Sequence, residues 1–362
     1  MAVTAAVVLM AGCGPPSPIP PEPPPEATVS EEPILLPTAA PSPTPAAAWP
    51  PPEGAVKNPP TAEKIELGRQ LFFEPILSDS GGMSCATCHR PELGFSNGQP
   101  VSPARPGAPP RNVSTLWNTG FNRFLLWDGR ESSLEEHARL PLTLPHEMAS
   151  DPDRIVATLQ GIPAYVQMFN TVFGGTEPIS FENTTRALAA FQRSLISDTS
   201  PYDRFVAGEK SSLTPEQQRG MALFFSQRTN CSECHQPPTF AMETFRVVGV
   251  NSEDPGRAAV HERGLYGAFK VPTLRNIART APYMHDGSFA ALENVVDFYA
   301  AGAGRAHDFP NVDPLLKGFD LDEQDRADLV AFLTALTDES GLPDVPERAL
   351  SGLPVIAPVD QK

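Results

Sequence analysis

Apolar residues recur at every third or fourth position along several segments of the chain, which is the pattern of helices that pack one face against a core. The segments are 134–140, 181–196 (FENTTRALAAFQRSLI), 292–300 (LENVVDFYA) and 322–336. Alternation of apolar and polar residues, the pattern of half-buried strands, is rare in the sequence. The sequence therefore predicts a mostly α-helical protein with long loops.

One order of motifs occurs twice along the chain. Thr61 is placed to cap a first helix, and Thr214 begins a second one, with proline at the first helical position and Gln217 completing a capping box. Both helices run into G-x-x-L-F-F, at 68–73 and 220–225, and then into C-x-x-C-H after a short loop. We infer that one domain plan has been duplicated.

Composition divides the chain further. Residues 1–13 hold a short apolar run, and residues 14–60 are rich in Pro, Ala, Ser and Glu, with almost no core-forming residues. The second composition cannot bury enough apolar surface to fold, so it predicts a disordered tether. The duplicated domains are expected at 61–200 and 201–345, followed by a C-terminal tail at 346–362.

The apolar run ends at Gly12-Cys13, which resembles the cleavage site of a bacterial lipoprotein signal. We expect an extracytoplasmic, periplasmic protein whose contact with a membrane is a lipid anchor on Cys13. An ordinary signal peptide is the alternative. The formal net charge of −16 argues against nucleic acid and against an anionic membrane surface as partners.

Four of the five cysteines form two C-x-x-C pairs, each followed directly by histidine. C-x-x-C-H is a haem c attachment site, in which two thiols add to the haem vinyl groups and the histidine binds iron. A structural zinc site needs four ligands, and each copy supplies three. We predict two covalent haem c groups, held by Cys85, Cys88 and His89 in the first domain and by Cys231, Cys234 and His235 in the second.

Several further blocks lie between and after these motifs. They are R-N at 111–112, L-W-D-G-R at 126–130, P-H-E-M at 145–148, F-K-V-P-T-L-R-N at 269–276 and A-P-Y-M-H-D-G at 281–287. On these blocks and their order, the sequence from about residue 61 to 336 resembles the bacterial di-haem cytochrome c peroxidase and MauG superfamily. The resemblance implies two cytochrome c-like domains, with hydrogen peroxide reduced at the N-terminal haem. It implies that a small c-type cytochrome or a cupredoxin gives electrons to the C-terminal haem, and we leave a homodimer open.

The resemblance assigns roles to two residues near the first haem. Trp127 corresponds to the tryptophan between the haems, suited to electron transfer, although an indole there could simply fill an interdomain core. Glu147 corresponds to the acid of the peroxide pocket, where a carboxylate can move the protons that peroxide cleavage needs. The alternative for Glu147 is a solvated loop residue.

The first haem site departs from the family pattern in two ways. His137 stands where the family usually has glutamine, and it can assist proton transfer, bind the iron or face solvent. Members that need reductive activation carry a histidine after the first haem motif, but no histidine occurs between Arg90 and Glu136. The first haem is therefore expected to keep an open position in the ferric protein.

The second haem site also departs from the peroxidase pattern. The methionine ligand of the peroxidases proper is replaced by Tyr299, fourteen residues after His285, and MauG-like members use tyrosine there. An anionic, hard phenolate favours the higher oxidation states of iron, so we expect Tyr299 as the second axial ligand. Met284 is the alternative. The resemblance also implies calcium bound by the Asn112 side chain and the carbonyls of Thr280 and Pro282.

Three functions are compatible with these residues. The leading hypothesis is a di-haem peroxidase. MauG-like oxidation of a protein substrate is a second, although Thr229 replaces the tryptophan that MauG has two residues before its second haem motif. A non-catalytic di-haem electron carrier is the third, and it requires His137 to bind the first iron.

Overall fold

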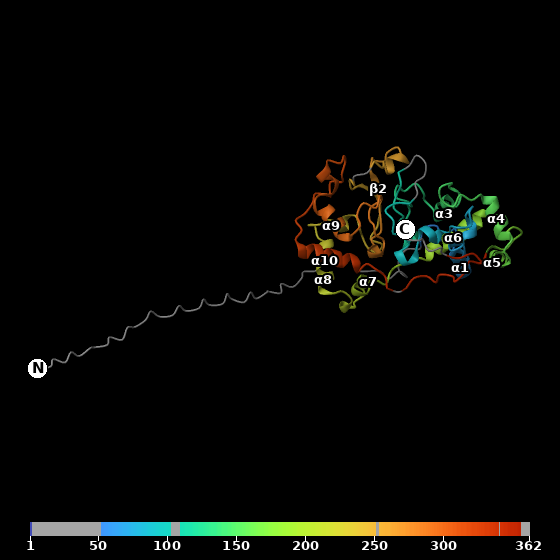
Figure 1. Cartoon of the computed structure of the whole chain (residues 1–362), viewed down its shortest axis with the longest axis horizontal. Helices are drawn as coiled ribbons and strands as arrows, with labels where there is room; N and C mark the ends of the chain where they lie inside the picture. The colour runs from blue at the N-terminus through green and yellow to red at the C-terminus, as the bar shows by residue number, and fades with distance from the viewer. Residues whose placement is uncertain (2–51, 103–108, 251–252, 340, 356–362) are drawn as a thin grey trace. The chain divides into compact units, whose positions relative to one another are not determined.

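The computed structural model describes Met1 and residues 52–102, 109–250, 253–339 and 341–355 (Figure 1). The predicted signal, Cys13 and the tether up to residue 51 lie outside the described residues. Within the described part of the chain, no helix is long and apolar enough to span a membrane.

The first half of the described chain is helical. Its helices are α1 (Ala62–Phe72), α2 (Cys85–Cys88), α3 (Leu134–Thr143), α4 (Pro152–Gln160), α5 (Pro163–Phe173) and α6 (Phe181–Ser194). The hydroxyl of Thr61 accepts a hydrogen bond from the Lys64 N–H, so α1 is capped as predicted. Helices α4 and α5 were not predicted, and each begins with a proline at a position where a missing N–H costs nothing.

The second half adds four helices and one small sheet. The helices are α7 (Pro201–Val206), α8 (Pro215–Phe224), α9 (Leu292–Ala300) and α10 (Glu323–Thr334). Strands β1 (Met242–Val247) and β2 (Ala268–Val271) pair antiparallel, with Phe245 opposite Lys270. The expectation of a mostly helical protein is confirmed, and α9 has the bounds that its apolar pattern predicted.

The repeated glycine of G-x-x-L-F-F lies at a helix crossing in both halves. Helix α1 packs on α6, and α8 packs on α10 (Figure 1). A Cβ on Gly68 would lie 2.0 Å from the carbonyl oxygen of Ala187, and one on Gly220 would lie 1.8 Å from that of Asp328. Only glycine permits these helix backbones to approach so closely, which explains why both copies of the motif carry it.

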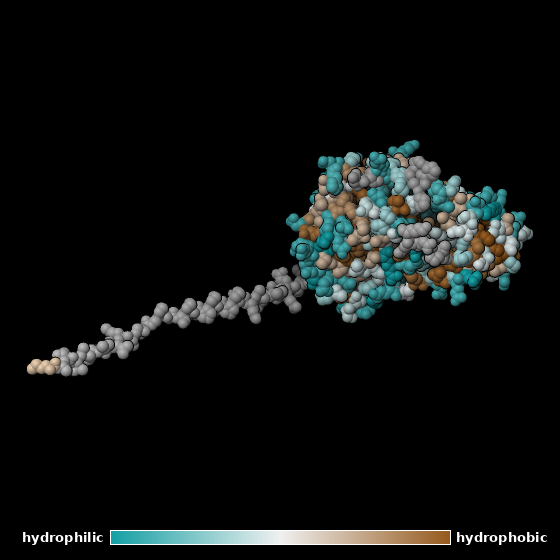
Figure 2. All heavy atoms as spheres, viewed as in Figure 1, coloured by the Kyte–Doolittle hydropathy of each residue, from teal (hydrophilic) through white to brown (hydrophobic). Residues whose placement is uncertain are grey.

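Two separate groups of buried apolar residues form the main cores. The first includes Leu71, Phe72, Phe191 and Leu195, and the second includes Phe224, Phe240, Phe332 and Leu336. On the face drawn in Figure 2, hydrophilic residues predominate and apolar residues occur in small groups. Burial of these aromatic and aliphatic side chains supplies most of the favourable free energy of folding.

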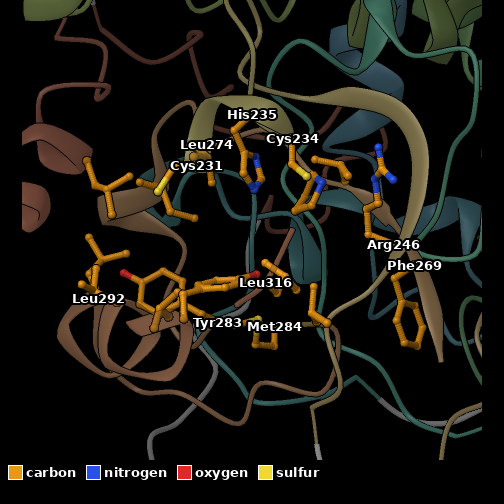
Figure 3. A pocket seen from close by; sticks show the side chains of 18 of the residues that line it. Cys231, Cys234, His235, Arg246, Phe269, Leu274, Tyr283, Met284, Leu292 and Leu316 are labelled. Carbon is orange, nitrogen blue, oxygen red and sulfur yellow. The ribbon is translucent and has the colours of Figure 1, made fainter. Parts of the chain in front are cut away.

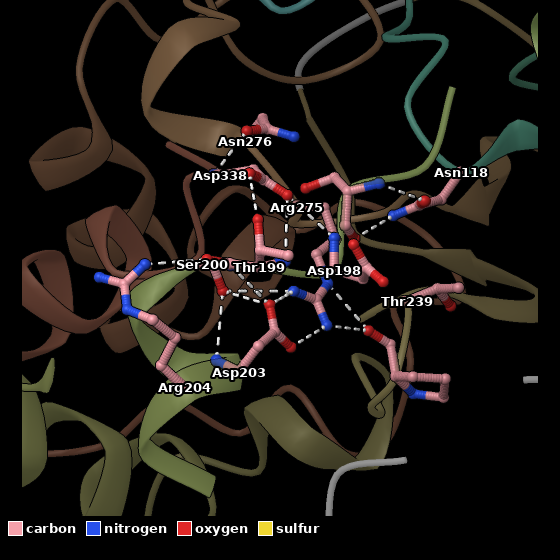
Figure 4. A network of polar contacts seen from close by, with 12 residues as sticks. Asn118, Asp198, Thr199, Ser200, Asp203, Arg204, Thr239, Arg275, Asn276 and Asp338 are labelled. Carbon is pink, nitrogen blue, oxygen red and sulfur yellow. Dashed lines mark hydrogen bonds and ion pairs between the residues drawn. The ribbon is translucent and has the colours of Figure 1, made fainter. Parts of the chain in front are cut away.

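A polar network holds the segment that joins α6 to α7 (Figure 4). The amide of Asn118 exchanges two hydrogen bonds with the backbone of Ser197, and the carboxylate of Asp338 accepts from the N–H groups of Asp198 and Thr199. The Arg275 guanidinium, 1 % exposed, pairs with Asp203 at the start of α7. The connection between the two halves is therefore a fixed part of the fold.

Parts of two regions predicted to lie outside the domains contact the folded core. In residues 52–60, predicted as part of the tether, the Glu53 N–H donates to the Gly120 carbonyl at 2.7 Å, and Asn58 is 3 % exposed. In the predicted tail, Ala349 and Val355 enter the first core. Each region is held by partners distant in the sequence, which composition alone does not reveal.

Candidate active site

The first C-x-x-C-H motif forms the single turn α2 and the residue that follows it. The Nδ1 of His89 lies 2.9 Å from the carbonyl oxygen of Phe95. With Nδ1–H as the donor, this bond fixes the ring and leaves Nε2 as the nitrogen available to iron.

The second motif repeats this geometry. The Nδ1 of His235 lies 3.0 Å from the carbonyl oxygen of Phe240. Phe95 and Phe240 both have positive φ, 62° and 53°, which turns each carbonyl toward its histidine. The duplication inferred from the sequence therefore extends to the bond that orients each iron-binding ring.

The four motif cysteines are free thiols and not disulfides. Burial raises the pKa of Cys85 to about 12 and that of Cys231 to about 11, so both are protonated at neutral pH. A buried neutral thiol is a poor ligand for a divalent cation but a suitable partner for an apolar vinyl group. The residues present fit covalent haem attachment better than zinc.

Each motif lies in the wall of a large cavity. The N-terminal cavity, about 270 Å³, is lined by Cys85, Cys88 and His89, and the C-terminal cavity, about 240 Å³, by Cys231, Cys234 and His235. In Figure 3, His235 and the two cysteines occupy one side of the C-terminal cavity, and Tyr283 and Met284 the other. Both cavities are lined mainly by apolar surface around the motif residues, as a haem c group would require.

The predicted catalytic residues meet in the N-terminal cavity, which Trp127, His137 and Glu147 line together with His89. Burial lowers the pKa of His137 to about 4, and the positive potential of His89 adds to this effect. The imidazole of His137 is therefore neutral at physiological pH. The structure places His137 in the lining of the cavity, which favours the two roles at the first haem over a solvent-facing position.

Glu147 occupies the mouth of the same cavity. Its side chain is 40 % exposed, and Oε1 lies 3.8 Å from Nε2 of His146. Its charge also acts on Cys85 and Cys88, in each case raising the pKa of the thiol, although burial has the larger effect. Glu147 thus connects the cavity with solvent.

The C-terminal cavity contains both candidates for the second axial ligand. Tyr299 and Met284 line it together with Tyr283, which the sequence analysis did not consider. Burial raises the pKa of Tyr299 well above its usual value and that of Tyr283 to about 12. Tyr283 had a sequence signal, because it stands beside Met284 in the A-P-Y-M-H-D-G block.

A thin wall separates the two cavities, and Asn112, Trp127 and Lys270 line both of them. The Trp127 Nε1–H donates to the carbonyl of Asn112 at 2.9 Å, and the carbonyl of Trp127 accepts from the Lys270 N–H at 2.8 Å. The Trp127 ring also lies edge-on to His285, with ring centroids 6.4 Å apart. Trp127 therefore lies in the wall that the two cavities share.

A buried ion cluster holds the loop that carries Trp127. Arg111 forms two hydrogen bonds with Asp254, at 2.6 and 2.8 Å, and a third with Asp128, at 2.7 Å. Asp128 and Asp254 are each 1 % exposed. Arg257 also donates to the carbonyls of Asp128 and Gly129, at 2.7 Å each. Paired charges of this kind fix the loop in one position, and sequence reasoning did not find them.

The three predicted calcium ligands line the C-terminal cavity together. The Nδ2 of Asn112 donates to the carbonyls of Gln99 and Pro100, at 3.0 and 3.2 Å, and in the described part of the chain its Oδ1 accepts no hydrogen bond. The residues present therefore offer neutral oxygen donors, with Thr280 and Pro282 contributing carbonyls, to a hard cation. Among the described residues no cluster of three His, Cys, Asp or Glu side chains offers another metal site.

Comparison with known proteins gives the class. A family model described as di-haem cytochrome c peroxidase matches residues 62–211. The methylamine utilization protein MauG of Methylorubrum extorquens is 39 % identical over 295 residues, covering 80 % of this chain and 82 % of MauG. Cytochrome c551 peroxidase of Nitrosomonas europaea is 33 % identical over 289 residues, covering 78 % and 82 % of the two chains.

A solved structure agrees with these relatives. A MauG-like protein associated with microbial copper homeostasis superposes with a TM-score of 0.73 at 36 % identity, covering 81 % of this chain and 94 % of the other. The fold and the paired haem-attachment motifs define a c-type cytochrome of the peroxidase type. The chain belongs to the di-haem cytochrome c peroxidase family, and membership implies two haem c groups.

Proposed function

We propose that this protein is a di-haem peroxidase that reduces hydrogen peroxide to water. The observation that carries the proposal is the meeting of His89, His137 and Glu147 in one cavity, with Trp127 in the wall toward the second haem motif. Reduction of one peroxide takes up two electrons and two protons and yields two waters. The haems, when bound, supply the redox-active iron for this reaction.

The residues of the N-terminal cavity move the protons. His137 is neutral, so one ring nitrogen can accept the proton of an entering peroxide. The side-chain amide of Gln192 lies within reach of the His137 ring, and neither His137 Nδ1 nor Gln192 Oε1 has a hydrogen-bond partner of good geometry among the described residues. We propose that Nδ1–H donates to Gln192 Oε1, which leaves Nε2 as the accepting atom. Glu147, in contact with solvent, returns protons to the cavity.

The wall between the cavities moves the electrons. Trp127 is held by its own Nε1–H, by its carbonyl and by the ion pairs of Asp128. A fixed aromatic ring shared by both cavities shortens the path for electron transfer between the two haems. Tyr299 would hold the second haem iron together with His235, as the resemblance to MauG-like members implies, with Met284 as the alternative.

The remaining assignments complete the proposal. Residues 61–200 and 201–345 are the two haem domains, and calcium binds Asn112, Thr280 and Pro282. The protein works in the periplasm, anchored through a lipid on Cys13, with a small c-type cytochrome or a cupredoxin as its electron donor. The net charge of −16 favours a partner with a basic docking surface. A homodimer is the oligomeric form to be tested.

The test is titration of the ferric holoprotein with hydrogen peroxide, followed by visible and near-infrared spectra. We expect a spectral change complete at about one equivalent of peroxide, and continuous peroxide consumption when a reduced c-type cytochrome is added. A protein with two haems per chain that fails to respond, even after half-reduction, would refute the proposal and leave a non-catalytic electron carrier.

One observation favours a second function. Tyr299 in the C-terminal cavity and the identity with MauG suit oxidation of a protein substrate with peroxide as the oxidant. Thr229, at the place of the MauG tryptophan, lines the same cavity and donates to the Leu223 carbonyl at 2.6 Å. Threonine has no aromatic ring that could carry electrons between the haem and a docked protein. We therefore rank this function second.

A further inference from the structure

Lys270 is a buried cation in the wall between the two cavities. It lies on β2 opposite Phe245 of β1, and its side chain is 8 % exposed. It lines both cavities, and its backbone N–H donates to the carbonyl of Trp127. A charged group at this position acts on both haem sites at once.

Few contacts from the described residues offset the cost of burying the Lys270 ammonium. Within the described part of the chain, Nζ makes one long hydrogen bond, 3.4 Å, to the Val271 carbonyl, and forms no ion pair with a carboxylate. Burial lowers the pKa of Lys270, and Glu243 opposes this effect from a distance. Glu243 is exposed, and its carboxylate accepts from the Phe124 N–H at 3.0 Å. Buried ammonium groups are paired or neutralised, and the described residues provide no anionic partner for Lys270.

The neighbouring cations differ from Lys270 in this respect. Arg111 is paired with Asp128 and Asp254, and Arg246 with Asp313 at 3.0 Å. Lys317 lines the C-terminal cavity but is exposed to solvent. Among the described residues of this wall, Lys270 is thus a buried cation without an anionic partner.

Haem c, the group that these cavities are expected to hold, supplies such an anion. Haem carries two propionates on the edge opposite the vinyl groups, and the vinyl groups bond the motif cysteines. We propose that the Lys270 ammonium binds a haem propionate at the wall beside Trp127. The inference rests on haem attachment and not on peroxidase activity. A positive charge fixed at the haem edge favours the ferrous state and so raises the reduction potential.

The test compares Lys270→Met, Lys270→Gln and Lys270→Arg with the wild type and with Lys57→Met, a control at an exposed lysine that lines neither cavity. Haem content is measured first by the pyridine haemochrome method, and midpoint potentials then by spectroelectrochemistry between pH 5.5 and 8. In the Met and Gln variants we expect the potential of at least one haem to fall. Its ferrous-to-ferric ratio at a fixed applied potential then drops by about tenfold, equivalent to 59 mV. The Arg variant and Lys57→Met stay within about twofold of the wild type.

The pH series adds a second readout. Without the ammonium, the propionate takes up a proton near neutral pH, so the shifted potential becomes dependent on pH. Fully loaded Met and Gln variants with both potentials within twofold of the wild type would overturn the proposal. Loss of haem from these two variants, with normal loading of the Arg variant, supports it, whereas loss from all three contradicts it. Peroxide takes no part in these measurements, so the result is independent of the proposed reaction.

Discussion

The indole Nε1–H of Trp127 donates a 2.9 Å hydrogen bond to the backbone carbonyl of Asn112. Asn112 in turn donates its own N–H to the carbonyl of His285 at 2.7 Å. The ring that lies between the two cavities is thereby tied to the backbone of a proposed calcium ligand, and that ligand to the second half of the chain. The residues proposed for electron transfer and calcium binding are thus joined to the contact between the halves by one short run of hydrogen bonds.

Trp127→Phe tests the role of this ring. Phenylalanine keeps most of the apolar volume but loses the hydrogen bond to Asn112, at a cost in stability of about 1 kcal/mol. We expect turnover with a reduced cytochrome to fall by about tenfold or more, equivalent to about 1.4 kcal/mol in the barrier. Stopped-flow reaction of the ferric protein with peroxide, which uses the first cavity, should change less.

Trp117→Phe is the matched control. Trp117 is 6 % exposed in the first core, lines neither cavity, and its Nε1 has no hydrogen-bond partner in the described structure. Equal losses of turnover in the two variants would show that Trp127 acts through packing and not through electron transfer.

His137→Ala separates two roles of the distal histidine. If Nε2 accepts the peroxide proton, the rate of the ferric protein with peroxide falls by about 10²-fold, and His137→Gln recovers part of it. If His137 bound the iron, its removal would open the site, and the rate would rise. Stopped-flow kinetics and the high-spin EPR signal of the first haem decide between these outcomes.

Tyr299→Phe and Met284→Leu identify the ligand of the second haem. Loss of an anionic phenolate removes the preference for ferric iron, so in Tyr299→Phe we expect a raised potential and a new high-spin EPR signal. Met284→Leu should leave both unchanged, and Tyr283→Phe serves as a control from the same cavity. A methionine-to-iron charge-transfer band in the wild type, lost in Met284→Leu, would assign the ligand to Met284 instead.

The calcium proposal predicts a ligand-dependent stability. At free calcium 100 times its Kd, binding to the folded state alone adds about 2.7 kcal/mol, which chelation should remove as a lower Tm. Asn112→Ala should abolish this difference while leaving the backbone bond to Trp127 in place. A Tm insensitive to chelation, with no calcium detected by elemental analysis, would rule the site out.

The local motifs predicted the haem-attachment residues. They could not predict residues whose partners are distant in the sequence. C-x-x-C-H specifies thiols and histidine within five residues, so both sites could be located from sequence. The partners of Arg111 are 17 and 143 positions away, and only the fold brings Asp128 and Asp254 to it. In the sequence, Lys270 is one charged residue in a short apolar segment. Only the structure shows that it lines both cavities.

The bounds of the helices show the same difference between what a local pattern predicts and what it misses. Segment 292–300 has a clean apolar period and a sharp end, and it forms α9 with these bounds. Helices α4 and α5 were missed because a single turn around Gly161 and Ile162 separates them, which breaks the period into two short pieces. Residues 52–60 were assigned to the tether because their composition is that of a linker, although Asn58 is bonded to Glu135 at 2.7 Å.

Glu135 provides a prediction of stability against pH. Its carboxylate accepts two hydrogen bonds from Arg193, at 2.7 and 2.8 Å, and one from Asn58, joining α3 to α6. The Arg193 side chain is 1 % exposed and that of Glu135 21 %. Glu135→Gln leaves a buried guanidinium without its counter-charge, which costs about 3 kcal/mol. Glu182→Gln, which removes the exposed partner of Arg186 in a 3.6 Å pair, is the control and should cost less than about 0.5 kcal/mol.

The sign of the pH effect follows from the pKa of Glu135. Burial alone would raise this pKa, but the hydrogen bonds from Arg193 and Asn58 outweigh it and hold the value below that of a free glutamate. The carboxylate therefore stabilises the protein above the unfolded-state pKa of about 4.3, and this contribution is lost as pH falls through the lower folded value. The Tm difference between wild type and Glu135→Gln should be constant from pH 7 to 5 and shrink below about pH 4. A difference that persists undiminished at pH 3 would show that the variant acts through packing, because protonation would then have removed nothing.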